Sequence, residues 1–401
     1  MGKKVLFYSG GGGLGHFARD LAIANELRKI KPGCEILWMA EEPASHVIKE
    51  AGEKVIDENC GRLNETFNLL PNENSEFNVN MFMLDYYQSK SKEDFAHQMA
   101  IIEREKPDIV VGDKDFAMIF QLPENQALMK QPFIAIWDFT KVAYSMTYNP
   151  KERFGLWMMN RMWHTGSKRE YTNPAAMIFL LPKDDIPDER LGLFLMNTRD
   201  VFSKQKSNYF VGYPIHFDPE EYKDTAALKK RLGYGKEPLI VCAVGGTFFG
   251  KGLLNLCGMT YPLIKAQIPD VKMVMVAGPS IETKSLKMPD GIEVRGYVPD
   301  LFEHFAACDL AIVLGGGTST LELAALKRPF IYFPLEKHAE QQIVIARRNE
   351  RYHAGIKMLF SKTTPEALAQ AVVSNIGKKV EYLEMPIDGC KKAAEVIAKF
   401  M

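Results

Sequence analysis

Short apolar segments alternate along this chain with amphipathic helical segments, and the alternation restarts once, near residue 237. Apolar runs without interspersed polar residues are typical of strands buried on both faces of a parallel sheet. Two such runs of strands and helices predict an α/β protein with two domains. The expected strands are residues 3–9, 35–40, 107–113, 132–139, 237–246, 271–278, 292–298, 309–317 and 329–335.

The boundary between the two domains is expected in "YFVGYPIHFDPEEY" (209–222), which contains two prolines and a glycine and precedes a new helix at 225–233. A chain of 401 residues also exceeds what one hydrophobic core usually organises. We therefore expect an N-terminal domain at 1–213 and a second domain at 214–385. A last helix, within 386–401, is expected to pack back on the first domain.

Composition excludes several classes of protein. The net charge is zero, so there is no general electrostatic reason to expect nucleic acid as a partner. The six cysteines are scattered without a CxxC pair, which indicates reduced thiols rather than a disulfide framework or a zinc site. No apolar run approaches the about 20 residues of a membrane span, and the chain enters a strand directly, without the pattern of a signal peptide. We expect a cytoplasmic protein.

A glycine-rich segment, "SGGGGLGH" (9–16), follows the first strand and opens the first helix. Glycine allows a sharp turn and a close approach to a ligand, and a helix N-terminus offers free N–H groups to an anion. The spacing fits the dinucleotide-binding fingerprint, but a tight turn that binds nothing explains it as well. We expect Gly12, Gly13 and Gly15 to form an acceptor or phosphate loop, with His16 projecting from it.

Two further glycine loops lie in the second half. "GGTFFGKG" (245–252) nearly has the P-loop spacing, but glycine stands where the magnesium-binding hydroxyl should be, so we reject an ATPase. "GGGTSTLE" (315–322) ends a strand and begins a helix that Thr318 could cap, and its start would meet a diphosphate. Glu322 could bind both hydroxyls of a ribose, although an acid there also simply stabilises the helix dipole.

Taken together, these motifs resemble those of MurG-like glycosyltransferases, which include the bacterial peptidoglycan N-acetylglucosaminyltransferase and plant galactolipid synthases. The resemblance covers nearly the whole chain and is strongest from 237 to 348. Two departures concern specificity: Ile345 stands near the family's asparagine, and Leu14 interrupts a Gly-Gly pair. The motifs that carry the resemblance are "GGGGLGH", "GYP" (212–214), "GGTFFG", "GYVPDLFEHFAACDL" (296–310), "GGGTSTLE" and "PLEKHAEQQIVIA" (334–346).

The resemblance implies the GT-B fold, in which two Rossmann-like domains face each other across a cleft, with the acceptor in the first and a UDP-sugar in the second. It implies transfer of a hexose or N-acetylhexosamine, with inversion, to an acceptor that is lipid-linked, related to the cell envelope or a small molecule. A UDP-sugar epimerase of similar fold is the alternative. An oxidoreductase rests on the first glycine loop alone, and a non-catalytic binding protein is also compatible with the fold.

Site residues follow from the resemblance by position. Tyr297 and Val298 would flank uracil, Glu322 would bind the ribose, and the two glutamines would reach the sugar hydroxyls. The full donor-binding set is Gly246, Thr247, Tyr297, Val298, Gly316, Gly317, Thr318, Ser319, Glu322, His338, Gln341 and Gln342.

The chemistry makes sense without a cofactor or a metal ion, because helix N-termini and aimed N–H groups can stabilise a leaving diphosphate. The acceptor hydroxyl needs a general base, for which His16 and Asp113 are both candidates. A purely structural His16, bonded to its own loop, is also possible. "DKD" (113–115) matches the short manganese motif of a different glycosyltransferase fold and leaves metal use open as the alternative.

One segment, "KERFGLWMMNRMWHTGSKREY" (151–171), has the composition of an interfacial helix: Trp157, Met158 and Trp163 lie among basic residues. It falls in the domain that should bind the acceptor. We predict that it docks on the inner face of the cell membrane, which would make the protein peripheral there. A methionine-lined acceptor groove or a core helix explains the same composition.

Overall fold

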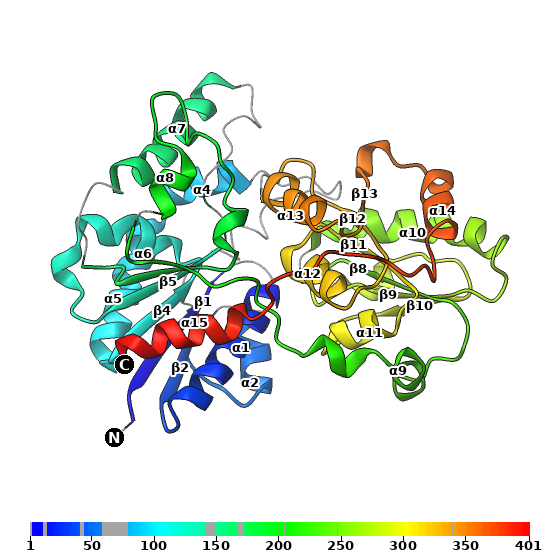
Figure 1. The fold of residues 1–401 in the computed structure, drawn as a ribbon, viewed down its shortest axis with the longest axis horizontal. Coiled ribbons are helices and arrows are strands. Elements are labelled where there is room, and N and C mark those ends of the chain that lie inside the picture. The colour runs from blue at the N-terminus through cyan, green and yellow to red at the C-terminus, as the bar shows by residue number, and fades with distance from the viewer. Residues whose placement is uncertain are drawn as a thin grey trace. The chain divides into compact units, whose positions relative to one another are not determined.

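The computed structural model describes residues 2–10, 14–40, 44–57, 79–138, 140, 149–166, 172–203, 205–246, 248–338 and 340–401. The chain divides into two compact units (Figure 1). The first unit holds the described residues up to His216 together with Pro386–Met401, and the second unit holds Phe217–Met385.

Within the described residues, the first unit contains a 7-stranded parallel sheet with the order β3-β2-β1-β4-β5-β6-β7. The order reverses between β1 and β4, which are neighbours in register from Val5 and Ile109 to Ser9 and Asp113. The strands are β1 (Lys4–Ser9), β2 (Glu35–Ala40), β3 (Lys54–Asp57), β4 (Ile109–Asp113), β5 (Phe133–Trp137), β6 (Ala176–Phe179) and β7 (Asn208–Phe210).

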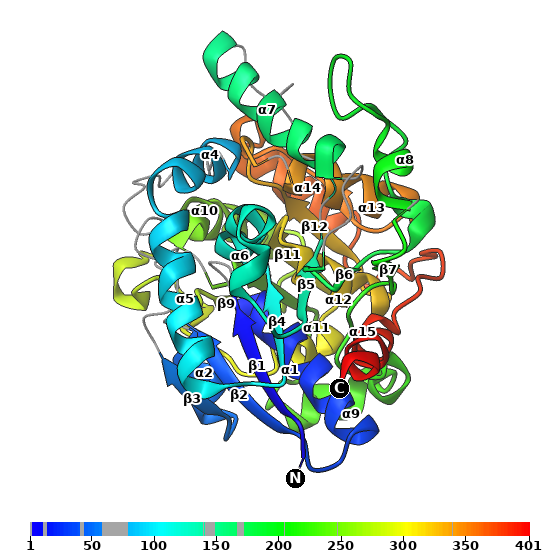
Figure 2. The ribbon, with the colours of Figure 1, turned by 90° about the vertical axis from the view of Figure 1, so that its left-hand side faces the viewer.

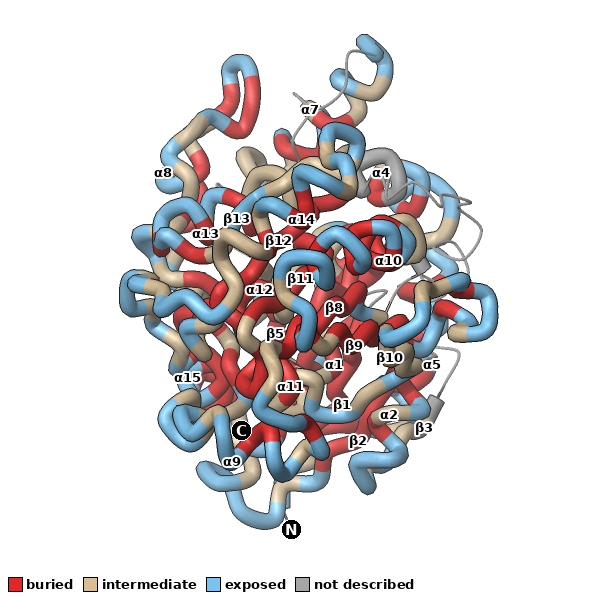
Figure 3. The backbone as a smooth tube through the Cα atoms, turned by 90° about the vertical axis from the view of Figure 1, so that its right-hand side faces the viewer, coloured by how far each residue is buried: buried red, intermediate tan, exposed pale blue. Residues whose placement is uncertain are grey.

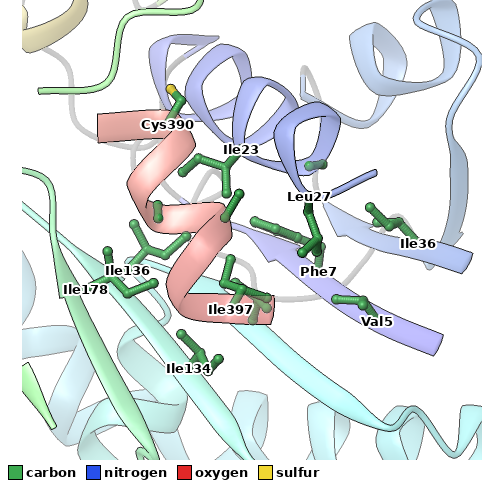
Figure 4. Packing of buried hydrophobic residues seen from close by; sticks show 14 of the residues in the cluster. Val5, Phe7, Ile23, Leu27, Ile36, Ile134, Ile136, Ile178, Cys390 and Ile397 are labelled. Atoms are coloured by element: carbon green, nitrogen blue, oxygen red, sulfur yellow. The ribbon is translucent and has the colours of Figure 1, made fainter. Parts of the chain in front are cut away.

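Helices cover both faces of this sheet, so its strands are apolar on both sides (Figure 2). On one face, Ile23 and Leu27 of α1 and Ile397 of α15 pack with Phe7 and other strand residues in a single buried cluster (Figure 4). The helices of the unit are α1 (Leu14–Ile30), α2 (Ala44–Glu50), α4 (Val79–Ser89), α5 (Ser91–Glu105), α6 (Phe116–Gln121), α7 (Pro150–Gly166), α8 (Thr198–Ser203) and α15 (Gly389–Ile397), with short 3-10 turns η1 (Leu122–Glu124), η2 (Gln126–Leu128), η4 (Lys183–Asp185) and η10 (Ala398–Phe400).

In the described part of the second unit, a 6-stranded parallel sheet with the order β10-β9-β8-β11-β12-β13 forms the centre, and its inner strands are buried (Figure 3). Here the order reverses between β8 and β11. The strands are β8 (Leu239–Ala243), β9 (Lys272–Val276), β10 (Ile292–Arg295), β11 (Leu310–Leu314), β12 (Phe330–Phe333) and β13 (Ile356–Lys357).

The helices of the second unit alternate with these strands. The α-helices are α9 (Thr225–Arg231), α10 (Lys251–Lys265), α11 (Leu301–Ala307), α12 (Gly317–Ala325), α13 (Ala346–Arg351) and α14 (Pro365–Val373). The short helices are η5 (Pro219–Tyr222), η6 (Phe248–Gly250), η7 (Thr283–Ser285), the π-helix η8 (Glu340–Ile345) and η9 (Phe360–Lys362).

The predicted fold class is confirmed, because both units are Rossmann-like parallel sheets flanked by helices. Every predicted strand is present, while β3, β6, β7 and β13 were not predicted. Three of these, β3, β7 and β13, are short strands at the sheet edges. The first unit extends to His216 because the backbone at Tyr213 pairs with the C-terminal segment: its N–H donates to Pro386 at 2.7 Å, and its carbonyl accepts from Gly389 at 3.0 Å.

Candidate active site

The carboxyl ends of β1 and β4 lie side by side where the strand order of the first unit reverses. Ser9 pairs with Asp113, and the N–H of Gly10 donates to the carbonyl of Asp113 at 3.1 Å. Open parallel sheets bind ligands beyond the carboxyl ends of the strands at such a switch point. The structure therefore brings the first glycine loop and "DKD" together, although Gly12 and Gly13 lie outside the described residues.

His16 and Asp113, the two candidate bases, are in contact. His16 lies in the first turn of α1, next to Gly15, and its Nδ1 is 2.9 Å from Oδ2 of Asp113. The His16 side chain is 20% exposed, whereas that of Asp113 is completely buried. Of the two side chains, only the imidazole of His16 can therefore contact a ligand, because the carboxylate of Asp113 is shielded from solvent.

Arg19 joins this pair to a second buried acid. Its Nε and Nη2 donate to both oxygens of Asp113 at 2.6–3.0 Å, and its Nη1 donates to Asp138 at 2.9 Å. Lys114 forms an ion pair with the other oxygen of Asp138 at 3.0 Å. Neither Arg19 nor Asp138 was predicted. The sequence offers one indication of Arg19: it follows His16 by three residues, a spacing that puts both side chains on one face of a helix.

The charges of this cluster set the protonation of His16. Burial, followed by the positive charges of Arg19 and Lys114, lowers the pKa of His16 despite the opposing influence of Asp113. Burial alone would raise the pKa of Asp113, but Arg19 and the contact with His16 lower it. A neutral imidazole therefore stands next to an ionised carboxylate at neutral pH.

Asp115, the second acid of "DKD", has other partners. Its Oδ1 accepts from the backbone N–H of Met118 at 3.1 Å, which caps α6, and from Nε2 of Gln98 at 3.2 Å. Burial raises the pKa of Asp115 to about 7. Asp113 and Asp115 thus serve separate hydrogen-bond networks. In the described ranges, no group of three or more His, Cys, Asp or Glu side chains is arranged to hold a metal ion.

The two other glycine loops follow β8 and β11, the strands at the switch point of the second unit. Gly245 has a positive φ of 76°, and the carbonyl of Gly246 accepts from Ser280 at 2.6 Å. Thr247 lies outside the described residues. Both loops therefore end at the edge of the sheet where a ligand of this unit would bind.

The helix after β11 begins without a side-chain cap. Its N-cap is Gly316, so the prediction that Thr318 caps it was wrong: Thr318 and Ser319 lie inside the first turn. The first N–H groups of a helix have no intrahelical partner, and an uncapped start can give them to an anion. Arg348 of α13, which was not predicted, reinforces this start by donating to the carbonyl of Gly317 at 3.0 Å and to Thr320 at 2.7 Å.

Glu322 lies farther along α12 and is only 7% exposed. Burial raises its pKa to about 8. An acid placed only to complement the helix dipole would be expected at the surface, where its charge is hydrated. The burial of Glu322 therefore indicates that it serves another purpose.

Gln341 and Gln342 hold the loop after β12. Oε1 of Gln341 accepts from the N–H of Leu335 at 2.8 Å, and Nε2 of Gln342 donates to the carbonyl of Pro334 at 3.0 Å. His338 lies one turn before Gln342, whose N–H donates to its carbonyl. Among the remaining donor candidates, Tyr297 follows β10 and is 40% exposed, and Val298 packs partly buried against the core.

Helix α7, which contains most of the predicted interfacial segment, has two different sides. Trp163 turns inward, with ring contacts to Trp137 and Phe202 at 6.1 and 5.2 Å. On the other side, exposed apolar residues of α7 meet a loop before α8. We call this set the apolar surface: Phe154 (64% exposed), Trp157, Met158 (39%), Leu193 (66%) and Phe194 (85%).

Hydrogen bonds from α7 fix the loop that carries Leu193 and Phe194. Trp157 donates to the carbonyl of Leu193, Asn160 donates to that of Leu191 at 2.9 Å, and His164 accepts from the N–H of Met196 at 3.0 Å. Residues 167–171 of the segment lie outside the described residues. Among the helices that the structure describes, none is long and apolar enough to cross a bilayer.

Comparisons with known proteins show which proteins this chain resembles. Residues 238–377 match the model of the family described as glycosyl transferases group 1. The UDP-N-acetylglucosamine–N-acetylmuramyl-(pentapeptide) pyrophosphoryl-undecaprenol N-acetylglucosamine transferase of Carboxydothermus hydrogenoformans is 24% identical over 345 residues, covering 84% of this chain and 78% of that protein. An uncharacterized glycosyltransferase of Methanosarcina mazei is 21% identical and covers 99% of this chain and 98% of its own length.

Solved structures agree on the fold. The glycotransferase of kitacinnamycin superposes with a TM-score of 0.62 at 16% identity over the full length of both chains. MurG of Acinetobacter baumannii superposes with a TM-score of 0.56 at 15% identity, covering 99% of each chain.

The fold is therefore GT-B, and residues 238–377 match a glycosyltransferase domain. As the motifs predicted, the chain is similar to MurG proteins in sequence and in fold. The relatives and structures named above are transferases, and they give the epimerase hypothesis no support.

Proposed function

We propose that this protein transfers a hexose or N-acetylhexosamine from a UDP-sugar to an acceptor hydroxyl, with inversion at the anomeric carbon. The observation that carries the proposal is the pairing of a partly exposed, neutral His16 with the buried carboxylate of Asp113 at a switch point. This pairing supplies a general base, which a protein that only binds sugar nucleotides does not need.

His16 acts as the base and Asp113 positions it. With Nδ1–H donated to Asp113, Nε2 carries the lone pair that takes the proton of the acceptor hydroxyl. The acceptor oxygen then bonds to the anomeric carbon as the bond from that carbon to the diphosphate breaks. UDP leaves with the electron pair, and the ionised Asp113 stabilises the imidazolium that forms.

The second unit holds the donor. The uncapped start of α12 faces the diphosphate with its N–H groups, and Glu322 accepts hydrogen bonds from the ribose hydroxyls. Negative charge on the departing diphosphate is stabilised by these amides and by the helix dipole, equivalent to about half a positive charge. The proposed reaction uses no cofactor or metal ion.

The acceptor is lipid-linked, and the apolar surface carries the protein to the cytoplasmic face of a membrane. Lys151, Arg153 and Arg161 of α7 are exposed near it and suit an anionic bilayer. A lipid-linked acceptor also fits the relative from Carboxydothermus hydrogenoformans, whose name specifies a pyrophosphoryl-undecaprenol substrate.

The test is a panel of UDP-sugars incubated with a membrane lipid extract or with water-soluble alcohols, scored for UDP release and for new glycolipid. His16→Ala should lower the rate of transfer about 10²–10⁴-fold and leave the Kd of UDP nearly unchanged. His46→Ala, at a 67% exposed histidine on α2 of the same unit, is the matched control. Undiminished transfer by His16→Ala would remove His16 from the mechanism, and failure of UDP to bind the wild-type protein would contradict the donor assignment.

A further inference from the structure

We propose that Arg19 is a positioning residue that competes with Asp113 for Nδ1 of His16 and so controls which nitrogen of the imidazole carries the proton. The proposal rests on the proposed role of His16 as the general base. Arg19 would thus affect catalysis through His16, without contacting either substrate itself.

The geometry makes Nδ1 of His16 a point of competition. It lies 2.9 Å from Oδ2 of Asp113 and 2.7 Å from Nη2 of Arg19. An ionised carboxylate can only accept a hydrogen bond, and a guanidinium can only donate one. Nδ1 can therefore donate to Asp113 or accept from Arg19, but it cannot do both with one proton.

The two arrangements differ in chemistry. When Nδ1 donates to Asp113, Nε2 is bare and can take the proton of an acceptor. When Nδ1 accepts from Arg19, the proton of the neutral ring resides on Nε2, and this nitrogen cannot act as a base. The position of the guanidinium thus decides whether His16 is active.

Asp138 and Lys114 determine where the guanidinium lies. Nη1 of Arg19 is anchored to Oδ2 of Asp138, and Lys114 holds the other oxygen of that carboxylate. All of these side chains are largely buried, so their charges are weakly screened. Asp20, on the same helix, is also buried and accepts from Ser9 at 2.6 Å. Within the described residues, the titratable groups of the cluster around His16 are Arg19, Asp20, Asp113, Lys114 and Asp138, and burial raises the pKa of Asp20.

The cluster predicts opposite effects for two substitutions. Arg19→Lys keeps a cation but loses the planar fork that reaches Asp113, Asp138 and His16 together. The proton should then move to Nδ1, and the pKa of His16 should rise, because Asp113 no longer shares its oxygens between the imidazole and the guanidinium. Asp138→Asn removes a negative charge and should lower the pKa of His16 further.

The experiment is ¹⁵N NMR of the imidazole of His16 in the full-length protein, recorded against pH without substrates, because the two nitrogens report the tautomer directly. Arg28→Lys is the matched control, since Arg28 also lies on α1 but binds Glu53 at 2.6–2.7 Å. Lys114→Asn removes a cation at a residue with φ of 46°, which asparagine tolerates, and should raise the pKa of His16.

The expected result is a shift toward Nδ1–H and a higher pKa in Arg19→Lys, a lower pKa in Asp138→Asn, and no change in Arg28→Lys. The acid limb of the pH profile of kcat should move in the same directions. The proposal would be overturned if the ¹⁵N shifts and the pKa of His16 were unchanged in both Arg19→Lys and Asp138→Asn. If Arg19→Lys does not fold, Asp138→Asn alone provides the test. Because the NMR titration needs no turnover, it fails or succeeds separately from the proposed transfer reaction.

Discussion

The indole N–H of Trp157 donates to the backbone carbonyl of Leu193 at 3.0 Å, and this bond fixes an exposed loop against α7. Phe194, the next residue, has a positive φ of 60° and is 85% exposed. A bulky aromatic residue is rarely placed in this backbone region. The loop therefore presents two apolar side chains to the outside in a defined conformation.

Replacing these side chains should release the protein from membranes. Fully burying one Leu or Phe contributes about 1.5–3 kcal/mol, so Leu193→Ser combined with Phe194→Asn should reduce flotation on anionic vesicles at least about tenfold. Leu128→Ser is the control, because Leu128 is 59% exposed on η2 and is not part of the apolar surface. Trp163→Ala should instead lower the stability, since Trp163 packs inward. Equal flotation of the double variant and the wild type would rule out docking through this surface.

Asp113→Asn should impair both catalysis and folding. Asparagine removes the charge that stabilises the imidazolium, and it leaves the buried guanidinium of Arg19 with one carboxylate fewer. Breaking a buried ion pair costs about 3–5 kcal/mol, so the Tm should fall together with kcat. His16→Ala, in contrast, should lower kcat with little change in Tm. Thermal denaturation and steady-state kinetics of both variants distinguish the two roles, and a full rate in Asp113→Asn would contradict the positioning role.

Glu322→Gln should make the protein more stable and a poorer binder of UDP. The folded protein holds a proton on Glu322 up to about pH 8, whereas the usual pKa is 4.5. Between these values the folded state binds more protons than the unfolded state, so the contribution of Glu322 to stability falls as pH rises. Glutamine removes this dependence and should raise the free energy of unfolding at pH 7 by up to roughly 3 kcal/mol.

The same shift predicts how nucleotide binding depends on pH. Ribose hydroxyls that donate to a carboxylate favour its ionised form, so the affinity for UDP should increase as pH rises from about 6.5 to 8.5. Calorimetric titration of wild type and Glu322→Gln measures this directly, and the slope should vanish in the variant. Glu384→Gln is the control, since Glu384 is 87% exposed. A wild-type affinity that does not change with pH would argue against contact between Glu322 and the ribose.

Transfer should be insensitive to chelation. Asp113 is bonded to Arg19 and His16, and Asp115 caps α6, so the two acids of "DKD" are committed to different partners. Rates measured with EDTA, and with EDTA followed by excess Mn²⁺, should agree. Loss of activity with EDTA that Mn²⁺ restores would revive the manganese hypothesis.

The fold could be predicted from the sequence largely because its strands are buried on both faces and therefore read as continuous apolar runs. The exceptions are instructive. Strand β3 (Lys54–Asp57) and strand β13 (Ile356–Lys357) are short and lie at sheet edges, where little apolar sequence is needed. Strand β6 (Ala176–Phe179) is a buried apolar run like the others, so its sequence carries the same signal.

In the sequence, glycine loops and strand ends point to His16, Asp113 and Glu322, whose roles in the site stay predictions. Arg19 and Arg348 could not be assigned in the same way, because their importance depends on carbonyls and carboxylates that other parts of the chain supply. Arg19, for example, binds Asp138, which lies 119 residues away in the sequence. Nothing local distinguishes either arginine from the many that lie on helix surfaces.

The pairing of Tyr213 with Pro386 and Gly389 makes the second unit an insertion into the first. Gly389 approaches the carbonyl of Gly212 so closely that an added Cβ would lie 2.6 Å from its oxygen, so only glycine fits there. The first unit therefore holds the two ends of the inserted second unit close together. A short linker in place of residues 217–385 would leave the first unit with a continuous core, whereas removing the last 16 residues would remove α15 from that core.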